Sequence, residues 1–172
     1  LKNKITNGGY FVTGRIQRID TAARKVFYEG YGLDENQDPY HAKIYRSNLD
    51  GSGFKQISNE EGNHRTNFSE SSKFFVDNYS ASNIVPRSVL KDANGNLLID
   101  LETADISLLK HAGWTKPEKF TVKADDGMTD LHGIMFKPFD FDPARQYPII
   151  SYAYPGPQVE SFGSSKEFTI TG

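Results

Sequence analysis

The sequence predicts a mainly β protein that contains two four-stranded antiparallel sheets of the kind that form propeller blades. Aromatic residues make up 13% of the chain, with 12 Phe and 9 Tyr, and such residues favour strands. The pattern of Lys25–Tyr31 (KVFYEGY) returns 48 residues later in Lys73–Tyr79 (KFFVDNY). A period of about 40 to 50 residues is typical of propeller blades.

Each copy of this pattern is followed by a second repeated feature, which is a pair of strands around a tight turn. Asp50-Gly51 and Asn94-Gly95 occupy these turns, and they supply the residues with positive φ that tight hairpins require. Propeller units bury their faces by stacking on neighbours, so two blades alone leave apolar surface uncovered. A small β-sandwich made from the same eight strands is the alternative.

The expected strands follow one another with short turns throughout the first 102 residues. A further strand, at residues 2–6, is expected to be the outer strand of a preceding blade. The eight blade strands are expected at residues 10–19, 25–31, 42–48, 54–58, 64–69, 73–80, 87–91 and 97–102.

The regular succession of strands and tight turns ends after Glu102. Residues 104–113 carry apolar side chains at helical spacing before a Gly, which predicts one short helix. Residues 118–124 and 131–137 predict a β-hairpin, with Asp125-Asp126 in its turn. We therefore expect a first domain over residues 1–102 and the start of a truncated second domain over residues 103–172.

A third strand of this second domain is expected at residues 147–154. Its apolar run ends at Pro155-Gly156-Pro157, where Tyr154 would emerge from a buried strand. A phenol hydroxyl held on such a rigid element can donate a hydrogen bond to the oxyanion of an acyl-transfer reaction. The alternative is a tyrosine that packs at a strand end beside a stiff turn.

Composition excludes several functional classes. The net charge of −2 and the lack of basic runs argue against a nucleic-acid or anionic-membrane partner. The chain has no Cys, so disulfides, thiolate metal sites and thiol nucleophiles are excluded, and its apolar stretches are too short to span a bilayer. Unpaired blade edges predict edge-strand association or a homodimer.

No motif in the chain predicts a metal or a cofactor. The alternating acids of residues 34–38 fail as a calcium loop because Pro39 replaces its glycine and Tyr45 its bidentate Glu. There is no nucleotide-binding glycine loop and no Gly-x-Ser-x-Gly nucleophile elbow. Four histidines lack ligand spacing and are expected at the surface or in blade packing; they are His41, His64, His111 and His132.

The segment Tyr147–Gln158 (YPIISYAYPGPQ), preceded by Phe120–Gly127 (FTVKADDG), resembles the start of the hydrolase domain in the dipeptidyl peptidase IV branch of the prolyl oligopeptidase family. Residues 62–69 and 73–79 resemble the last propeller blade of that family. The resemblance implies the end of a β-propeller over residues 1–102, followed by the first strands of an α/β-hydrolase domain.

The resemblance also implies an activity. Members of this branch are serine exopeptidases that release Xaa-Pro or Xaa-Ala dipeptides from peptide N-termini, and Tyr154 matches the tyrosine of their oxyanion hole. The family's Ser, Asp and His, and its glutamates for the substrate amine, have no counterpart here, so the chain is expected to be inactive alone. Pro155 departs from the small residue that is usual before the motif's Gly156.

The implied partners are a peptide substrate and the remainder of the protein's own propeller and hydrolase domain. The resemblance implies a periplasmic or secreted location. Two other interpretations remain open at this point: a non-catalytic β-rich binding or scaffold module, and a different peptidase of the prolyl oligopeptidase family.

Overall fold

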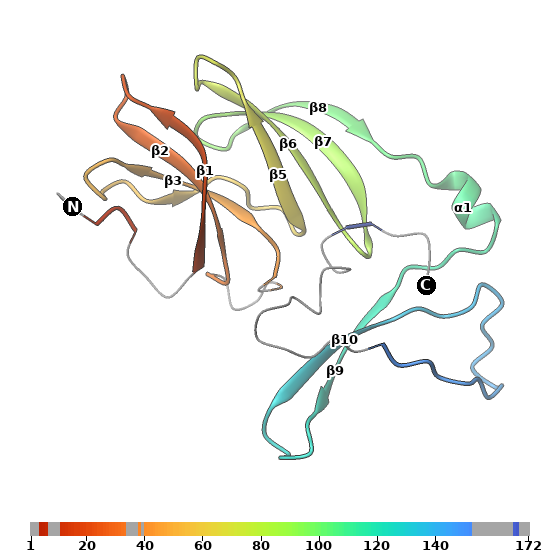
Figure 1. Cartoon of the computed structure of the whole chain (residues 1–172). Helices are drawn as coiled ribbons and strands as arrows, with labels where there is room; N and C mark the ends of the chain where they lie inside the picture. The colour runs from red at the N-terminus through yellow and green to blue at the C-terminus, as the bar shows by residue number, and fades with distance from the viewer. Residues whose placement is uncertain (1–3, 7–10, 34–37, 39, 153–166, 169–172) are drawn as a thin grey trace.

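The structure, a computed structural model, describes residues 4–6, 11–33, 38, 40–152 and 167–168. Two four-stranded antiparallel sheets lie side by side, and a hairpin extends away from them (Figure 1). The first sheet consists of β1 (Phe11–Asp20), β2 (Lys25–Tyr31), β3 (Lys43–Asn48) and β4 (Lys55–Gln56). The second sheet consists of β5 (Asn63–Phe68), β6 (Phe74–Ala81), β7 (Ile84–Asp92) and β8 (Leu97–Thr103).

In both sheets the spatial order of the strands follows the chain order. Each sheet is thus a simple meander, which is the topology of a propeller blade. The prediction of a mainly β chain with two four-stranded blades is confirmed. The largest difference in a strand boundary is at β7, which begins at Ile84 rather than at residue 87 because it pairs with β6 along almost its whole length.

The two predicted hairpin turns are confirmed, and they reveal a further element of the repeat. Gly51 and Gly95 have φ of 88° and 85°. A Cβ on Gly51 would lie 2.4 Å from the carbonyl oxygen of Lys4, and one on Gly95 would lie 2.5 Å from that of Ile57. In each case the turn is pressed against the segment that leads into its own sheet, so a side chain has no room at either glycine.

The strand expected at residues 2–6 is wrong for the part that the structure describes, because residues 4–6 form no strand. Lys4 contacts Gly51 as Ile57 contacts Gly95, and Ile57 comes just after β4 has ended at Gln56. Residues 4–6 therefore correspond to the linker that follows an outer strand. Residues 1–3 lie outside the described residues.

The main apolar core lies between the two sheets. The Phe27 ring of β2 lies 4.7 Å from the Phe68 ring of β5, measured between centroids. Alternate side chains of β2 point to opposite faces, so Val26 and Tyr28 pack on the other face of the first sheet with Tyr45. The buried residues between the sheets are Phe27, Ile44, Ile57 and Phe75.

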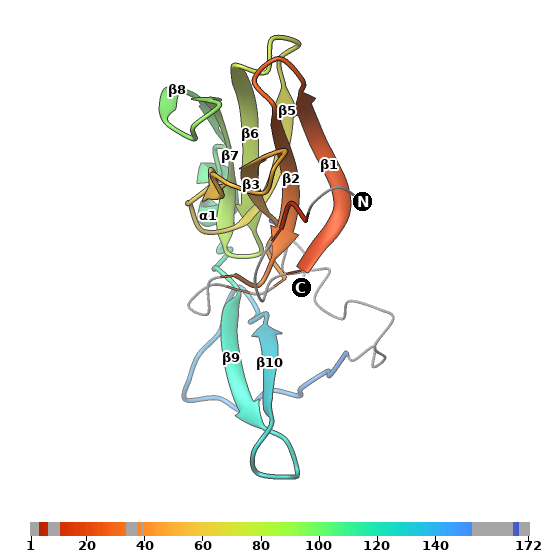
Figure 2. The same cartoon turned by 90° about the vertical axis from the view of Figure 1, so that its left-hand side faces the viewer.

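Beyond Thr103 the chain forms a short helix, α1 (Ser107–His111), and then the hairpin of β9 (Glu118–Lys123) and β10 (Asp130–Met135). Figure 2 shows this hairpin projecting away from the two sheets. The Asp126 carboxylate accepts hydrogen bonds from the backbone N–H groups of Met128 and Thr129, at 2.8 Å each. The predicted helix, hairpin and turn role of Asp126 are confirmed.

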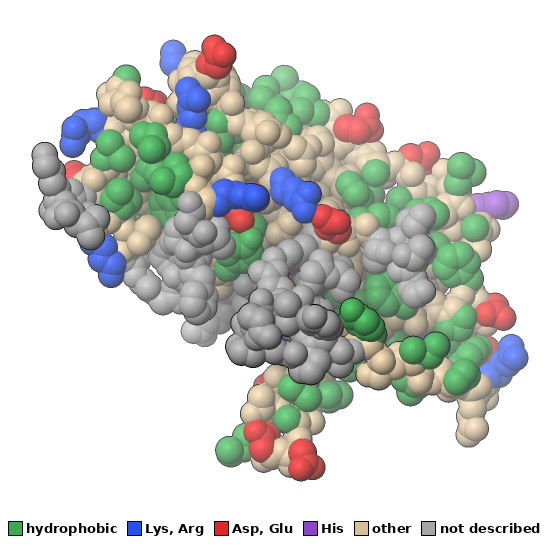
Figure 3. All heavy atoms as spheres, in the orientation of Figure 1, with side chains coloured by type: hydrophobic (Ala, Val, Ile, Leu, Met, Phe, Trp, Pro, Cys, Tyr) green, Lys and Arg blue, Asp and Glu red, His purple; other side chains and the backbone are tan. Residues whose placement is uncertain are grey.

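The strand expected at residues 147–154 is wrong for residues 147–152, which form no strand. Ile149 and Ile150 are 93% and 95% exposed, and hydrophobic side chains also reach the surface of the projecting hairpin (Figure 3). A strand needs a partner for its backbone groups. Within the described part of the chain, β9 and β10 pair only with each other, and residues 147–152 pair with neither of them.

Candidate functional site

The predicted oxyanion residue, Tyr154, lies outside the described residues. Tyr152, in the same segment, is 87% exposed. The best organised polar site in the described part of the chain lies elsewhere, at the junction between the two sheets. We call it the charge cluster; its members are Lys43 of β3, Glu60 of the linker, His64 of β5, Asp77 of β6 and Lys91 of β7.

The alternation of β6 explains why an acidic residue is buried there. Phe75, Asp77 and Tyr79 are two residues apart and share one face of the strand, and all three are buried. The backbone N–H of His64 donates to the carbonyl of Ala42 at 3.0 Å, which fastens the start of β5 to the first sheet. The cluster therefore forms where β5 and β6 meet the chain of the preceding blade.

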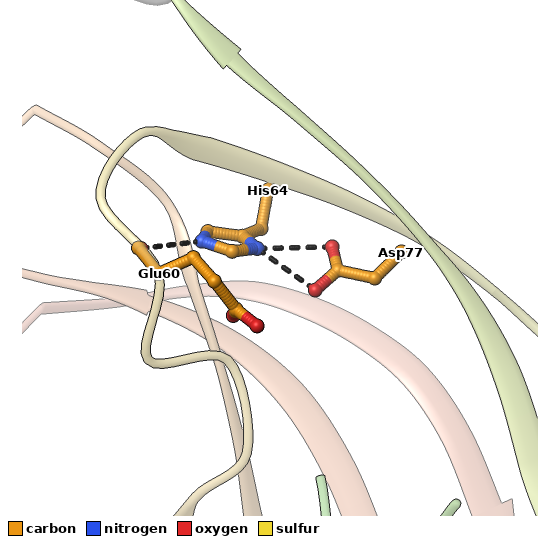
Figure 4. A group of neighbouring side chains, drawn as sticks. All are labelled: Glu60, His64 and Asp77. Carbon is orange, nitrogen blue, oxygen red and sulfur yellow. Dashed lines mark hydrogen bonds and ion pairs between the residues drawn. The ribbon is translucent and has the colours of Figure 1, made fainter. Parts of the chain in front are cut away.

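His64 is the centre of the cluster, and its ring lies between Glu60 and Asp77 (Figure 4). The Nδ1 atom lies 2.9 Å from each carboxylate oxygen of Asp77, and Nε2 lies 2.9 Å from the backbone oxygen of Glu60. Both partners are acceptors, so the contacts are satisfied together when both ring nitrogens carry a proton. The ring also stacks on Tyr79, with centroids 5.1 Å apart.

Two lysines complete the cluster from opposite sheets. The Lys91 ammonium donates to Asp77 Oδ2 at 2.9 Å and to Glu60 Oε2 at 2.5 Å. The Lys43 ammonium donates to the backbone oxygen of Glu60 and lies 3.4 Å from His64 Nε2. Side chains of Lys91 and Asp77 are 1% and 0% exposed, so this ion pair is almost completely removed from water.

These contacts shift the pKa values of the cluster. Burial alone would raise the pKa of Asp77, but the hydrogen bond and charge of His64, with Lys91, hold it below its ordinary value. Burial likewise opposes ionisation of Glu60, whose pKa is lowered by the Lys91 hydrogen bond. Burial lowers the pKa of Lys43 to about 8, although Glu60 and Asp77 act in the opposite direction.

Three side chains of the cluster have the composition of a metal site. The potential ligand atoms of Glu60, His64 and Asp77 lie within 4.8 Å of one another. However, Lys91 already places a positive charge between the two carboxylates, and both nitrogens of His64 are engaged with acceptors. A divalent cation would have to displace a buried ammonium group, so the arrangement is that of an internal ion network.

The histidines lie where the sequence predicted, either in blade packing or at the surface. His41 and His64 are buried within the blades, whereas His111 and His132 are exposed. The cluster itself was not predicted. One signal could have revealed it: Asp77 falls at an inward position of an alternating strand, where an unpaired carboxylate would be costly.

A family model described as the dipeptidyl peptidase IV N-terminal region matches residues 1–86, which is half of the chain. Human dipeptidyl peptidase 8 is 27% identical over 168 residues, covering 91% of this chain and 18% of that protein. Dipeptidyl-aminopeptidase B of Aspergillus niger is 23% identical over 171 residues, covering 96% of this chain and 18% of that protein. The chain thus spans about a fifth of the length of these curated relatives.

Solved structures share the fold. The crystal structure of Porphyromonas gingivalis dipeptidyl peptidase 4 matches 95% of this chain and 23% of its own, with a TM-score of 0.72 and 24% identity. A putative dipeptidyl aminopeptidase IV from Bacteroides ovatus matches 94% of this chain and 22% of its own, with a TM-score of 0.70 and 27% identity.

The residues matched by the family model cover most of the two sheets. Residues 1–86 include the whole first sheet and the first two strands of the second, together with four members of the charge cluster. No helix among the described residues is long and apolar enough to cross a membrane. With its two meander sheets and this match, the chain belongs to the dipeptidyl peptidase IV family.

Proposed function

We propose that this chain is part of a serine exopeptidase that releases Xaa-Pro or Xaa-Ala dipeptides from peptide N-termini. Its two sheets would be the end of the β-propeller, and residues 103–172 would begin the α/β-hydrolase domain. The proposal rests on one observation above all: similarity to dipeptidyl peptidases continues through both regions, over 91% to 96% of the chain.

Within this proposal Tyr154 is the catalytic contribution of the chain. Its hydroxyl would donate a hydrogen bond to the oxyanion of the tetrahedral intermediate, and a backbone N–H beside the nucleophile would supply the second donor. The nucleophile, its His and its Asp would come from other parts of the protein. The 172 residues alone would then release no dipeptide.

The test uses the full-length protein with Gly-Pro-p-nitroanilide and with the same substrate acetylated at its N-terminus. Release of nitroaniline from the free-amine substrate and none from the acetylated one is expected of an exopeptidase that binds the amine. Equal turnover of the two substrates would indicate an endopeptidase or acylaminoacyl peptidase of the same wider family. No turnover of either by the full-length protein would favour a binding or scaffold role.

The role of Tyr154 has its own matched control in the chain. Tyr154→Phe should lower kcat by about 10² to 10³-fold with little change in KM, as loss of one oxyanion donor does. Tyr152→Phe removes a hydroxyl from an exposed position two residues earlier and should leave kcat unchanged. Wild-type kcat in Tyr154→Phe would reject the catalytic role while leaving the exopeptidase proposal intact.

A periplasmic or secreted location is part of the proposal, and only the family resemblance supports it. A periplasmic or secreted peptidase should be recovered with the periplasmic or culture fraction of its native cells. Recovery with the cytoplasmic fraction would contradict it.

A further inference from the structure

The charge cluster connects the first sheet, the linker at residues 57–62 and the second sheet. Lys43 comes from the first sheet, Glu60 from the linker at residues 57–62, and His64, Asp77 and Lys91 from the second sheet.

The linker is tied to the first sheet by backbone and hydroxyl hydrogen bonds. The N–H of Ile57 donates to the carbonyl of Ile44 at 2.8 Å, and the N–H of Ile44 donates to Ser58 Oγ at 2.8 Å. These two bonds contain no ionisable group, so their strength does not depend on pH. A third contact with the first sheet does carry a charge, because the Lys43 ammonium donates to the backbone oxygen of Glu60, but it involves neither carboxylate.

Beyond Ile57, which shares the apolar core with Phe75 of β6, the linker is tied to the second sheet through Glu60. Its backbone oxygen accepts from His64 Nε2 and its carboxylate accepts from Lys91 Nζ. Asp77 holds both of these donors in place from the other side. The second attachment is therefore ionic, and it depends on two carboxylates remaining charged.

Loss of those carboxylate charges would leave an unfavourable arrangement. Lys91 and His64 have side chains 1% and 0% exposed, and Lys43 is 4% exposed as a residue. Without Asp77 and Glu60 as anions, these groups would be buried positive charges with no counter-charge. Water would have to enter, and the Glu60 side of the cluster is the part nearest to solvent, with a side chain 35% exposed.

We propose that the charge cluster is an acid-released latch, which fastens residues 59–62 of the linker to the second sheet and frees them when Asp77 and Glu60 become protonated, while both sheets stay folded. The apolar cluster of Phe27, Ile44, Ile57 and Phe75 continues to hold the sheets together. This conformational device is independent of the peptidase proposal.

The direction of the pH dependence follows from the carboxylates. Both pKa values are lower in the folded protein than their ordinary values, so the latch is closed above the usual range of Asp and Glu. It is lost as the pH falls through the folded pKa values, which lie below the ordinary values of the two acids. The other ionisable groups around the acids are Lys43 on β3, Glu61 in the linker, His64 on β5, Tyr79 on β6, and Arg87 and Lys91 on β7.

The test is thiol labelling of the full-length protein, because these 172 residues contain no Cys. Ser58→Cys places a thiol directly before the released residues 59–62, whose departure would uncover it, and Ser47→Cys places one on β3; both serines are 0% exposed. Each thiol is labelled with 4,4′-dithiodipyridine, which reacts at acid as well as neutral pH, and mass spectrometry of the labelled peptide identifies the site. The first thiol reports release of the linker, and the second reports unfolding of the first sheet.

Asp77→Asn imitates the protonated acid at pH 7. It should increase the labelling rate of Ser58→Cys about 100-fold and that of Ser47→Cys less than about threefold, since a buried ion pair loses one partner. Asp140→Asn makes the same change at an exposed site and should alter neither rate. Adding Lys91→Met to Asp77→Asn removes an unpaired charge and should lower the Ser58→Cys rate at least about tenfold.

If Asp77→Asn does not fold, Glu60→Gln replaces it in the test, because the Glu60 side chain is partly exposed. Glu60→Gln should likewise increase the labelling rate of Ser58→Cys much more than that of Ser47→Cys. The unmutated cluster should release Ser58→Cys at a higher pH than Ser47→Cys during acidification. Equal acceleration of both thiols, or of neither, would overturn the latch. So would failure of Lys91→Met to slow the labelling, because a purely steric defect would not be relieved by removing a charge.

Discussion

Residues 11–103 and residues 104–152 both contain antiparallel strands, yet they bury their side chains very differently. In the first region β2 is buried at five consecutive positions, with the pattern of a strand covered on both faces, and only the edge strand β8 is exposed throughout. In the second region β9 is exposed at all six of its positions. The difference shows that a hairpin can form by local pairing alone, whereas burial requires a second sheet to pack against.

The same contrast appears in the polar groups. The charge cluster is buried between two sheets, whereas Lys123–Asp130 and Lys137–Glu118 are ion pairs on the exposed hairpin. Exposed pairs of this kind stabilise a fold by about 0 to 1 kcal/mol. Changes in the first region are therefore expected to have much larger effects than equivalent changes in the second.

The largest effect is expected from removal of a core ring. Phe27→Ala empties the space between the sheets and should lower the free energy of unfolding by about 3 to 5 kcal/mol. Phe139→Ala, at a side chain 53% exposed, should lower it by less than about 1 kcal/mol. Urea denaturation of the 172-residue chain followed by circular dichroism measures both; equal losses would mean that the two regions are not packed differently.

Most of the first region could be predicted because local signals agree there with the final packing. The strand at Lys25–Tyr31 has the bounds that the repeat predicts, and Gly51 and Gly95 mark both hairpin turns. The apolar run at residues 147–152 carried an equally clear local signal and formed no strand. Pairing depends on a neighbouring edge, which periodicity within one segment does not reveal.

A smaller effect is expected from the titration of Lys43, whose pKa is about 8 in the folded chain and 10.5 in its ordinary state. Between these values the unfolded chain binds a proton that the folded chain has lost, so the free energy of unfolding rises with pH. The rise should be about 1 to 2 kcal/mol, after allowance for solvent screening.

The measurement is urea denaturation at pH 7.5 and pH 9.5, for the wild type and for Lys43→Met. The variant carries no titrating group at this position, so its gain in stability between the two pH values should be smaller than that of the wild type. An identical gain in both proteins would show that Lys43 titrates as an ordinary surface lysine.

The smallest and most local effect is expected in the hairpin. Gly133 lies opposite Phe120, and a Cβ at residue 133 would come within 2.2 Å of the Phe120 ring. Gly133→Ala should push the ring aside and destabilise the hairpin by about 1 kcal/mol, without altering the two sheets. Hydrogen exchange should be faster only in residues 118–135, and Phe120→Leu should relieve part of the effect.

The charge cluster could not be predicted from spacing, because its members lie on four strands and a linker. His64 and Asp77 are 13 residues apart and meet only after β5 and β6 pair. The sequence predicts only that His64 lies at the surface or in blade packing; the structure places it in blade packing, and its partners depend on the tertiary register. Tyr154 illustrates the opposite case, since its proposed role depends on sequence similarity and not on described geometry.

The most direct test of the contrast between the two regions is hydrogen exchange of the 172-residue chain at neutral pH, resolved by peptide. Amides of β2, β3 and β6 should exchange with one common, high opening free energy. Amides of β9 and β10 should exchange at least about 100-fold faster, because few buried contacts hold the hairpin closed. Equal protection of the hairpin and the sheets would contradict the account, since it would make residues 11–135 a single cooperative unit.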